Sequence, residues 1–141
     1  MNAKIIKKPS KKESRQDLLR TTVSLTVDLT PLGSEQTLTF ETTNLSLQGM
    51  FISINNLEDC LFEERKTLVK GKLWIGEFKG YQMKEKNIEF LGKIVRVGKE
   101  KSVSGIGLKI IEMTTDSKKM LEELININNS LLHMERQSAS A

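Results

Sequence analysis

The chain has 141 residues, of which 38% are hydrophobic and 28% charged, and its formal net charge is +4. This length fits one domain with one hydrophobic core, and the composition excludes a wholly disordered chain. No apolar run approaches the roughly 18 residues that a membrane span requires, and a single cysteine excludes an internal disulfide and fits a reducing cytoplasm. We therefore expect a small soluble cytoplasmic domain.

The excess of positive charge lies at the N-terminus. Residues 1–20 hold seven basic and two acidic side chains, a net charge of +5, whereas the other 121 residues hold 15 basic and 16 acidic side chains, a net charge of −1. Such an arm attracts phosphate by long-range electrostatic forces. No aromatic residue lies among its lysines, so it lacks the stacking surface typical of nucleic-acid binding. We expect residues 1–13 to form a flexible basic arm.

Six segments after this arm have the composition of β-strands. In the first, Val23, Leu25 and Val27 alternate with polar residues, which is the period of a half-buried strand. The other five segments are residues 36–43, 50–54, 67–78, 86–97 and 105–111, and turn residues separate most of them. Gly98 to Lys101 is a hairpin signal. Six strands at this spacing predict a closed barrel or a sandwich.

The apolar period changes after Met113. Apolar residues then recur at spacings of three and four, as in an amphipathic helix: Met120, Leu121, Leu124, Ile127 and Leu131. We predict a helix over residues 114–136, with Thr115 or Asp116 as its N-cap, and a disordered tail over residues 137–141. The helix is expected to cover one open end of the strands.

The residue types that catalysis or metal binding requires are sparse. His133 is the only histidine, it lies near the end of the predicted helix, and Cys60 has no histidine near it in sequence. Gly105-Ile106-Gly107 lacks the remaining spacing of a dinucleotide-binding fingerprint, and no P-loop is present. We expect no enzymatic activity, no cofactor and no metal site.

Two short segments carry polar residues that suit a phosphate or guanine ligand. The first, residues 14–20, ends in Arg20, and an arginine fork fits guanine O6 and N7 or stacks on a purine. The second is the segment from Asn44 to Gly49, in which Asn44 and Ser46 can fix a turn or bind a guanine edge or phosphate. Gly49 lets the backbone approach a ligand closely. Taken alone, this segment fits an Asx-turn between two strands, with Gly49 as a bulge residue, better than it fits a ligand site.

Together these segments resemble the PilZ family, whose signature is RxxxR followed later by (D/N)xSxxG. The second motif matches fully in Asn44, Ser46 and Gly49, and the apolar run usual in the family follows it. The later family pattern is present in residues 92–97 and 105–110. The resemblance covers residues 14–113 and implies an all-β domain, a six-stranded antiparallel β-barrel, that binds the bacterial second messenger cyclic di-GMP.

The first motif departs from the family pattern. Arg20 corresponds to the second arginine, but Gln16 stands at the position of the first. Arg15 either aligns with an extra basic residue that many members carry, or it replaces the first arginine through a loop shifted by one residue. The ligand-binding residues that the resemblance implies are Arg15, Gln16, Arg20, Asn44, Ser46 and Gly49.

The resemblance implies a non-catalytic cyclic di-GMP receptor. In this interpretation the ligand orders the basic arm, and the altered surface meets an unidentified protein partner. Two alternatives remain open. One is a degenerate PilZ domain that binds no nucleotide and acts as a protein-interaction adaptor. The other is a small nucleic-acid-binding barrel that uses the lysine arm, although we expect no DNA contact.

Overall fold

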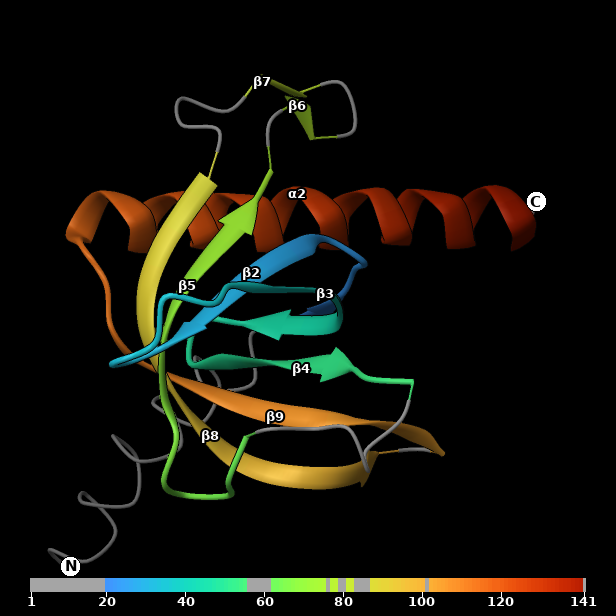
Figure 1. The fold of residues 1–141 in the computed structure, drawn as a ribbon. Coiled ribbons are helices and arrows are strands. Elements are labelled where there is room, and N and C mark those ends of the chain that lie inside the picture. The colour runs from blue at the N-terminus through green and yellow to red at the C-terminus, as the bar shows by residue number, and fades with distance from the viewer. Residues whose placement is uncertain are drawn as a thin grey trace, which may run out of the picture.

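The computed structural model describes residues 20–55, 62–75, 77–78, 81–82, 87–100 and 102–140 (Figure 1). Its elements in chain order are β1 (Arg20–Thr22), β2 (Thr26–Pro31), β3 (Leu38–Ser46), β4 (Gly49–Ser53), β5 (Leu68–Trp74), β6 (Glu77–Phe78), β7 (Tyr81–Gln82), β8 (Asn87–Glu100), β9 (Val103–Glu112) and α2 (Thr115–Ser140). The predicted basic arm over residues 1–13 lies outside the described residues.

Six of the strands form a closed antiparallel barrel. Their order is β3–β2–β5–β8–β9–β4, and the pairing of β4 with β3 closes the ring. β1 pairs with the second half of β3, whereas β2 pairs with its first half. β6 and β7 form a separate hairpin. The prediction of a six-stranded antiparallel barrel with one C-terminal helix is confirmed.

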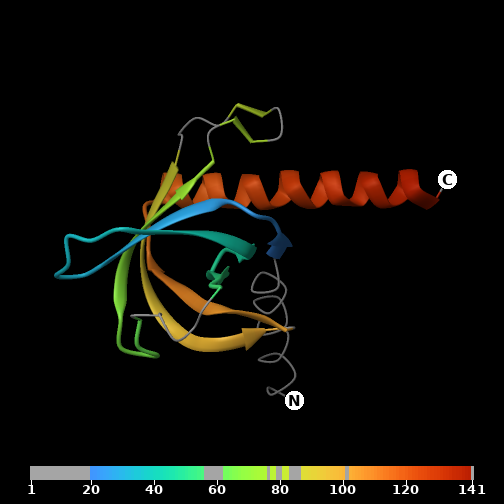
Figure 2. The ribbon, with the colours of Figure 1, turned by 45° about the vertical axis from the view of Figure 1, so that its right-hand side comes forward.

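Alternating apolar side chains fill the barrel, and α2 contributes to the same core. Val27 and Leu29 of β2 are fully buried, as the period of two predicts. Leu121 and Leu124 of α2 belong to this core cluster. In Figures 1 and 2 the helix lies across one end of the barrel, as expected, and its C-terminal part extends past the strands. Among the described residues, no helix has the length and apolar character needed to cross a membrane.

The ends of α2 differ from the prediction. Thr114 is the N-cap rather than Thr115 or Asp116, because the backbone N–H of Ser117 donates to Thr114 Oγ1 at 3.1 Å. The helix continues to Ser140, past the predicted end at residue 136, and includes most of the predicted tail over residues 137–141. No glycine or proline interrupts it, and alanine near its end favours helix.

Two strands extend past their predicted ends. β3 continues to Ser46, so the turn that was expected from Asn44 onward is reduced to Leu47 and Gln48. β8 continues to Glu100, and the hairpin turn includes Ser102, which has a φ of 71°. Pairing with strands on both sides outweighs the local turn preference, because Asn44 is in register with Thr22 on one side and with Phe51 on the other.

The first predicted strand is interrupted between β1 and β2. There the buried Thr42 of β3 uses its hydroxyl as both donor and acceptor: Oγ1 donates to Val23 O at 2.7 Å and accepts from Leu25 N at 3.0 Å. The register of β3 against β4 shifts between Thr42 and Asn44. The threonine thus satisfies backbone groups of the segment between β1 and β2, which lies outside the ladder.

Candidate ligand-binding site

The pairing of β1 with β3 brings the two predicted motif segments together. Arg20 is in register with Ser46, and Thr22 is in register with Asn44. Directly opposed residues of an antiparallel pair have Cβ atoms roughly 4.5–5.5 Å apart. The arginine that ends the first segment therefore stands beside the serine of the second.

These residues line a pocket of about 320 Å³ on the outer side of the barrel. Its described lining comes from β1, the β3–β4 hairpin, β8 and β9, and comprises Arg20, Asn44, Ser46, Gln48, Gly49, Met50, Phe51, Val95, Arg96, Gly107, Leu108 and Lys109. Four of the six predicted ligand-binding residues are in this list. The other two, Arg15 and Gln16, lie outside the described residues.

Ser46 shapes the turn between β3 and β4. Its Oγ accepts from the backbone N–H groups of Gln48 and Gly49, at 3.3 and 3.2 Å, and donates to Gly49 O at 3.2 Å. This is the local hydrogen bonding by which serine stabilises turns. The hydroxyl therefore has a structural role at the edge of the pocket.

Gly49 allows β4 to approach β9 closely. A Cβ at this position would overlap the backbone carbonyl of Leu108. Its φ is not in the left-handed region, where Gly33 is the only glycine among the described residues. The alternative that Gly49 is a bulge residue is wrong, because the irregularity of this strand pair lies between Thr42 and Asn44.

Arg96 and Phe51 form a cation–π contact in the pocket. The guanidinium carbon of Arg96 lies 5.7 Å from the centroid of the Phe51 ring, and Phe51 is buried. The ring has room because β9 carries glycines beside it: Gly107 is its register partner, and a Cβ at Gly105 would lie 2.9 Å from a ring atom. Arg96 was not among the predicted site residues. The register of β8 against β9 shifts between Ile94 and Arg96, and the local sequence pattern does not reveal this shift.

The pocket is positively charged. Arg20, Arg96 and Lys109 line it, all three are exposed, and no acidic residue is among its described lining residues. Such a surface attracts phosphate groups, and arginine adds planar recognition of purines. Within the described residues, no group of three or more His, Cys, Asp or Glu side chains is placed to hold a metal ion. The chemistry that these residues offer is binding of an anionic, aromatic ligand.

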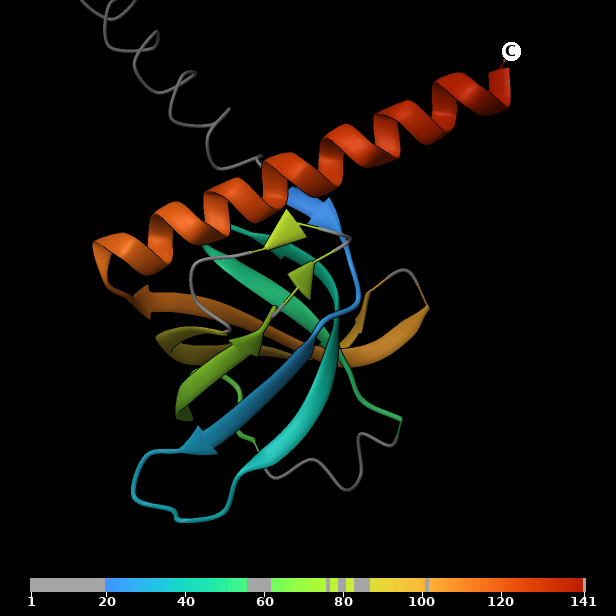
Figure 3. The same cartoon turned by 90° about the horizontal axis from the view of Figure 1, so that it is seen from above.

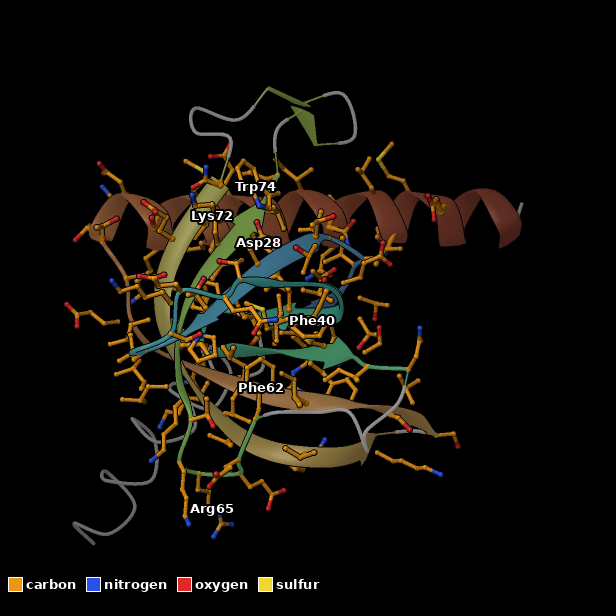
Figure 4. The ribbon with its side chains drawn as sticks, viewed as in Figure 1. Asp28, Phe40, Phe62, Arg65, Lys72 and Trp74 are labelled. Carbon is orange, nitrogen blue, oxygen red and sulfur yellow. The ribbon has the colours of Figure 1, made fainter. Side chains whose placement is uncertain are left out.

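A separate polar cluster lies on the outer face of β2, β3 and β5, and Figure 4 shows three of its members, Asp28, Lys72 and Trp74. Thr39 Oγ1 donates to Asp28 Oδ1 at 2.6 Å, and Trp74 Nε1 donates to Asp28 Oδ2 at 2.7 Å. Lys72 Nζ lies 5.4 Å from the centroid of the Trp74 ring. The hydrogen bonds from Thr39 and Trp74, together with the charge of Lys72, hold the pKa of Asp28 below its ordinary value of 3.8.

Comparison with models of known protein families identifies the family to which this barrel belongs. The PilZ domain family model matches residues 11–126. The chain belongs to the PilZ family. A search of curated proteins gave no match.

Three solved structures share the fold of this PilZ domain. The Bacillus subtilis inhibitor of motility MotI/DgrA has 18% identity and a TM-score of 0.59, with 79% of this chain and 49% of that chain covered. The PilZ domain of CeSA from a cellulose-synthesizing bacterium has 14% identity and a TM-score of 0.53, with 81% and 98% covered. The PilZ domain of YcgR from Escherichia coli, solved with c-di-GMP, has 15% identity and a TM-score of 0.57, with 86% and 94% covered. The chain thus spans about half the length of MotI/DgrA.

Proposed function

We propose that this PilZ domain is a non-catalytic receptor for cyclic di-GMP. The observation that carries the proposal is the register of β1 and β3, which sets Arg20 opposite Ser46 and joins both motif segments in one cationic pocket. The likeness to the YcgR PilZ domain, solved with c-di-GMP, supports the same ligand class.

The ligand offers two phosphates and two guanines, and the pocket offers a partner for each kind of group. Arg20 binds a phosphate or the O6 and N7 edge of a guanine. The guanidinium of Arg96, which lies 5.7 Å from the centroid of the Phe51 ring, offers a planar cation on which a purine can stack. Asn44 contributes amide hydrogen bonds, and Lys109 adds positive charge without the planar fork.

We also propose how the domain signals, and the distribution of charge in the sequence supports this part of the proposal. Residues 8–20 carry most of the basic excess of the chain, and Arg15 and Arg20 flank their C-terminal part. A dianionic ligand that bridges these arginines to the segment from Asn44 to Gly49 neutralises this charge and orders residues 8–20, which include the end of the basic arm. The changed surface then binds a protein partner in the cytoplasm.

Calorimetric titration of the chain with cyclic di-GMP tests the proposed function, with cyclic GMP as the control ligand because it has one guanine and one phosphate. We expect saturable binding of cyclic di-GMP that weakens as salt rises. Absence of binding at low salt by the folded protein would contradict the proposal and favour the adaptor alternative.

Gln16 is the feature that favours the adaptor alternative, since it carries no charge at the position of the first arginine. Gln16→Arg restores the family pattern and should tighten binding, because a charge-assisted hydrogen bond typically contributes about 1.5–3 kcal/mol where it is desolvated. If Gln16→Arg has no effect and Arg15→Ala abolishes binding, Arg15 fills the role of the first arginine. Binding that is indifferent to both changes would place the ligand elsewhere.

A further inference from the structure

The helix α2 contacts the strand that carries Arg20. Asn128 Nδ2 donates to Thr21 Oγ1 at 2.6 Å and to Thr22 O at 2.9 Å, and Asn129 Nδ2 donates to Arg20 O at 3.1 Å. Figure 3 shows the blue strand β1 beside the middle of this helix. Two neighbouring asparagines of α2 thus bind all three residues of β1.

These amides occupy the place of a neighbouring strand. β1 has three residues and pairs with β3 along one edge. Carbonyl groups two residues apart in a strand point to the same side, and the carbonyls of Arg20 and Thr22 both accept from α2. β1 is therefore held between β3 and two side chains of the helix.

Asn128 is an unusual residue for a core-facing helix position. It is fully buried, and its Oδ1 has no hydrogen-bond partner among the described residues. Burying a polar atom without a partner is unfavourable, and an apolar side chain of similar size would avoid this. Stability alone does not explain the residue, whereas the two bonds of its Nδ2 to β1 do.

We propose that Asn128 and Asn129 are positioning residues for the ligand site. By holding the backbone of β1, they keep Arg20 in register with Ser46 and its side chain at the pocket. The inference rests on the proposed function, since it concerns how Arg20 is presented to cyclic di-GMP. Because such coupling is reciprocal, a partner that displaces α2 weakens ligand binding by the same factor by which the ligand opposes that displacement.

Asn129→Ala compared with Asn126→Ala provides a matched test. Both residues are on α2, but Asn126 is exposed and outside these hydrogen bonds. Calorimetric titration with cyclic di-GMP should give a dissociation constant about three- to tenfold higher for Asn129→Ala, the range of one hydrogen bond. Asn126→Ala should match the parent. The amide of Val23, which donates to Thr43 O, should exchange hydrogen faster in Asn129→Ala.

Asn128→Leu separates positioning from stability. The leucine fills the same space and removes the unpaired Oδ1, but it leaves Thr21 Oγ1 and Thr22 O without their bonds to Asn128. These two effects on the urea midpoint oppose each other, whereas cyclic di-GMP binding by the folded variant should weaken further than in Asn129→Ala. If both variants bind cyclic di-GMP as the parent does, the positioning role is wrong and the proposed function stands. If the parent does not bind cyclic di-GMP at all, the proposed function fails, and this inference fails with it.

Discussion

Arg20 and Ser46 face each other across β1 and β3, and this single register pair joins the two halves of the site. β1 can pair with β3 at this position because the Thr42 hydroxyl forms hydrogen bonds with Val23 O and Leu25 N, where β1 and β2 separate. On its other edge, α2 binds the same strand through Asn128 and Asn129. The site thus depends on a three-residue strand held by side chains as much as by its sheet partner.

Replacing Arg20 with alanine should weaken cyclic di-GMP binding by about 2–5 kcal/mol, the range for removing one partner of a charged pair that is buried in the complex, because the ligand would cover the exposed guanidinium. Arg20→Lys should recover part of the lost binding free energy, because lysine keeps the positive charge but lacks the planar guanidinium with its paired N–H donors. Titration calorimetry measures both, with Lys70→Ala as the control that removes an exposed positive charge on β5 outside the pocket. Equal binding by a folded Arg20→Ala variant would contradict the site.

Replacing Arg96 tests whether its guanidinium stacks on the ligand. We expect Arg96→Ala to weaken binding by about 1–3 kcal/mol, as for the loss of one stacked base. Arg96→Lys should behave almost like the alanine variant, since an ammonium group has no plane to stack. Full recovery of affinity by lysine would show instead that only the charge of Arg96 matters.

Much of this architecture follows from local sequence patterns. The period of two identified the strand segments, the period of three and four identified α2, and the Asn44 to Gly49 segment identified one wall of the pocket. Arg96 and Lys109 were not predicted as site residues, because their place depends on which strands are neighbours and on the register shift after Ile94. The close contact that Gly49 allows also could not be predicted from the sequence, because its partner, Leu108, is in β9, a strand distant in sequence.

Thr42→Val should destabilise the fold by about 1–3 kcal/mol. The change keeps the shape of the side chain but leaves Leu25 N and Val23 O without the hydroxyl that bonds to both. Urea unfolding measures the loss, and Thr26→Val, at an exposed position of β2, should change stability little. If Thr42→Val were as stable as the parent, the break between β1 and β2 would not depend on this hydroxyl.

Asp28 should make stability depend on pH in the acid range. Its pKa is lowered in the folded state, so its contribution is present above the ordinary value of 3.8 and is lost as pH falls below that value toward the folded pKa. The urea midpoint of the parent should therefore exceed that of Asp28→Asn near neutral pH, and the difference should shrink at low pH. Fluorescence of Trp74, the only tryptophan, reports the unfolding. A difference that stays constant with pH would rule out this linkage.

Amide NMR spectra recorded during titration with cyclic di-GMP show directly whether the ligand binds at this pocket. We expect the largest shifts at four residues from strands that meet at one pocket: Arg20, Asn44, Gly49 and Arg96. The indole N–H signal of Trp74, in the separate cluster around Asp28, should stay unchanged. Absence of shifts at the pocket under saturating ligand, or shifts confined to other parts of the barrel, would contradict the account.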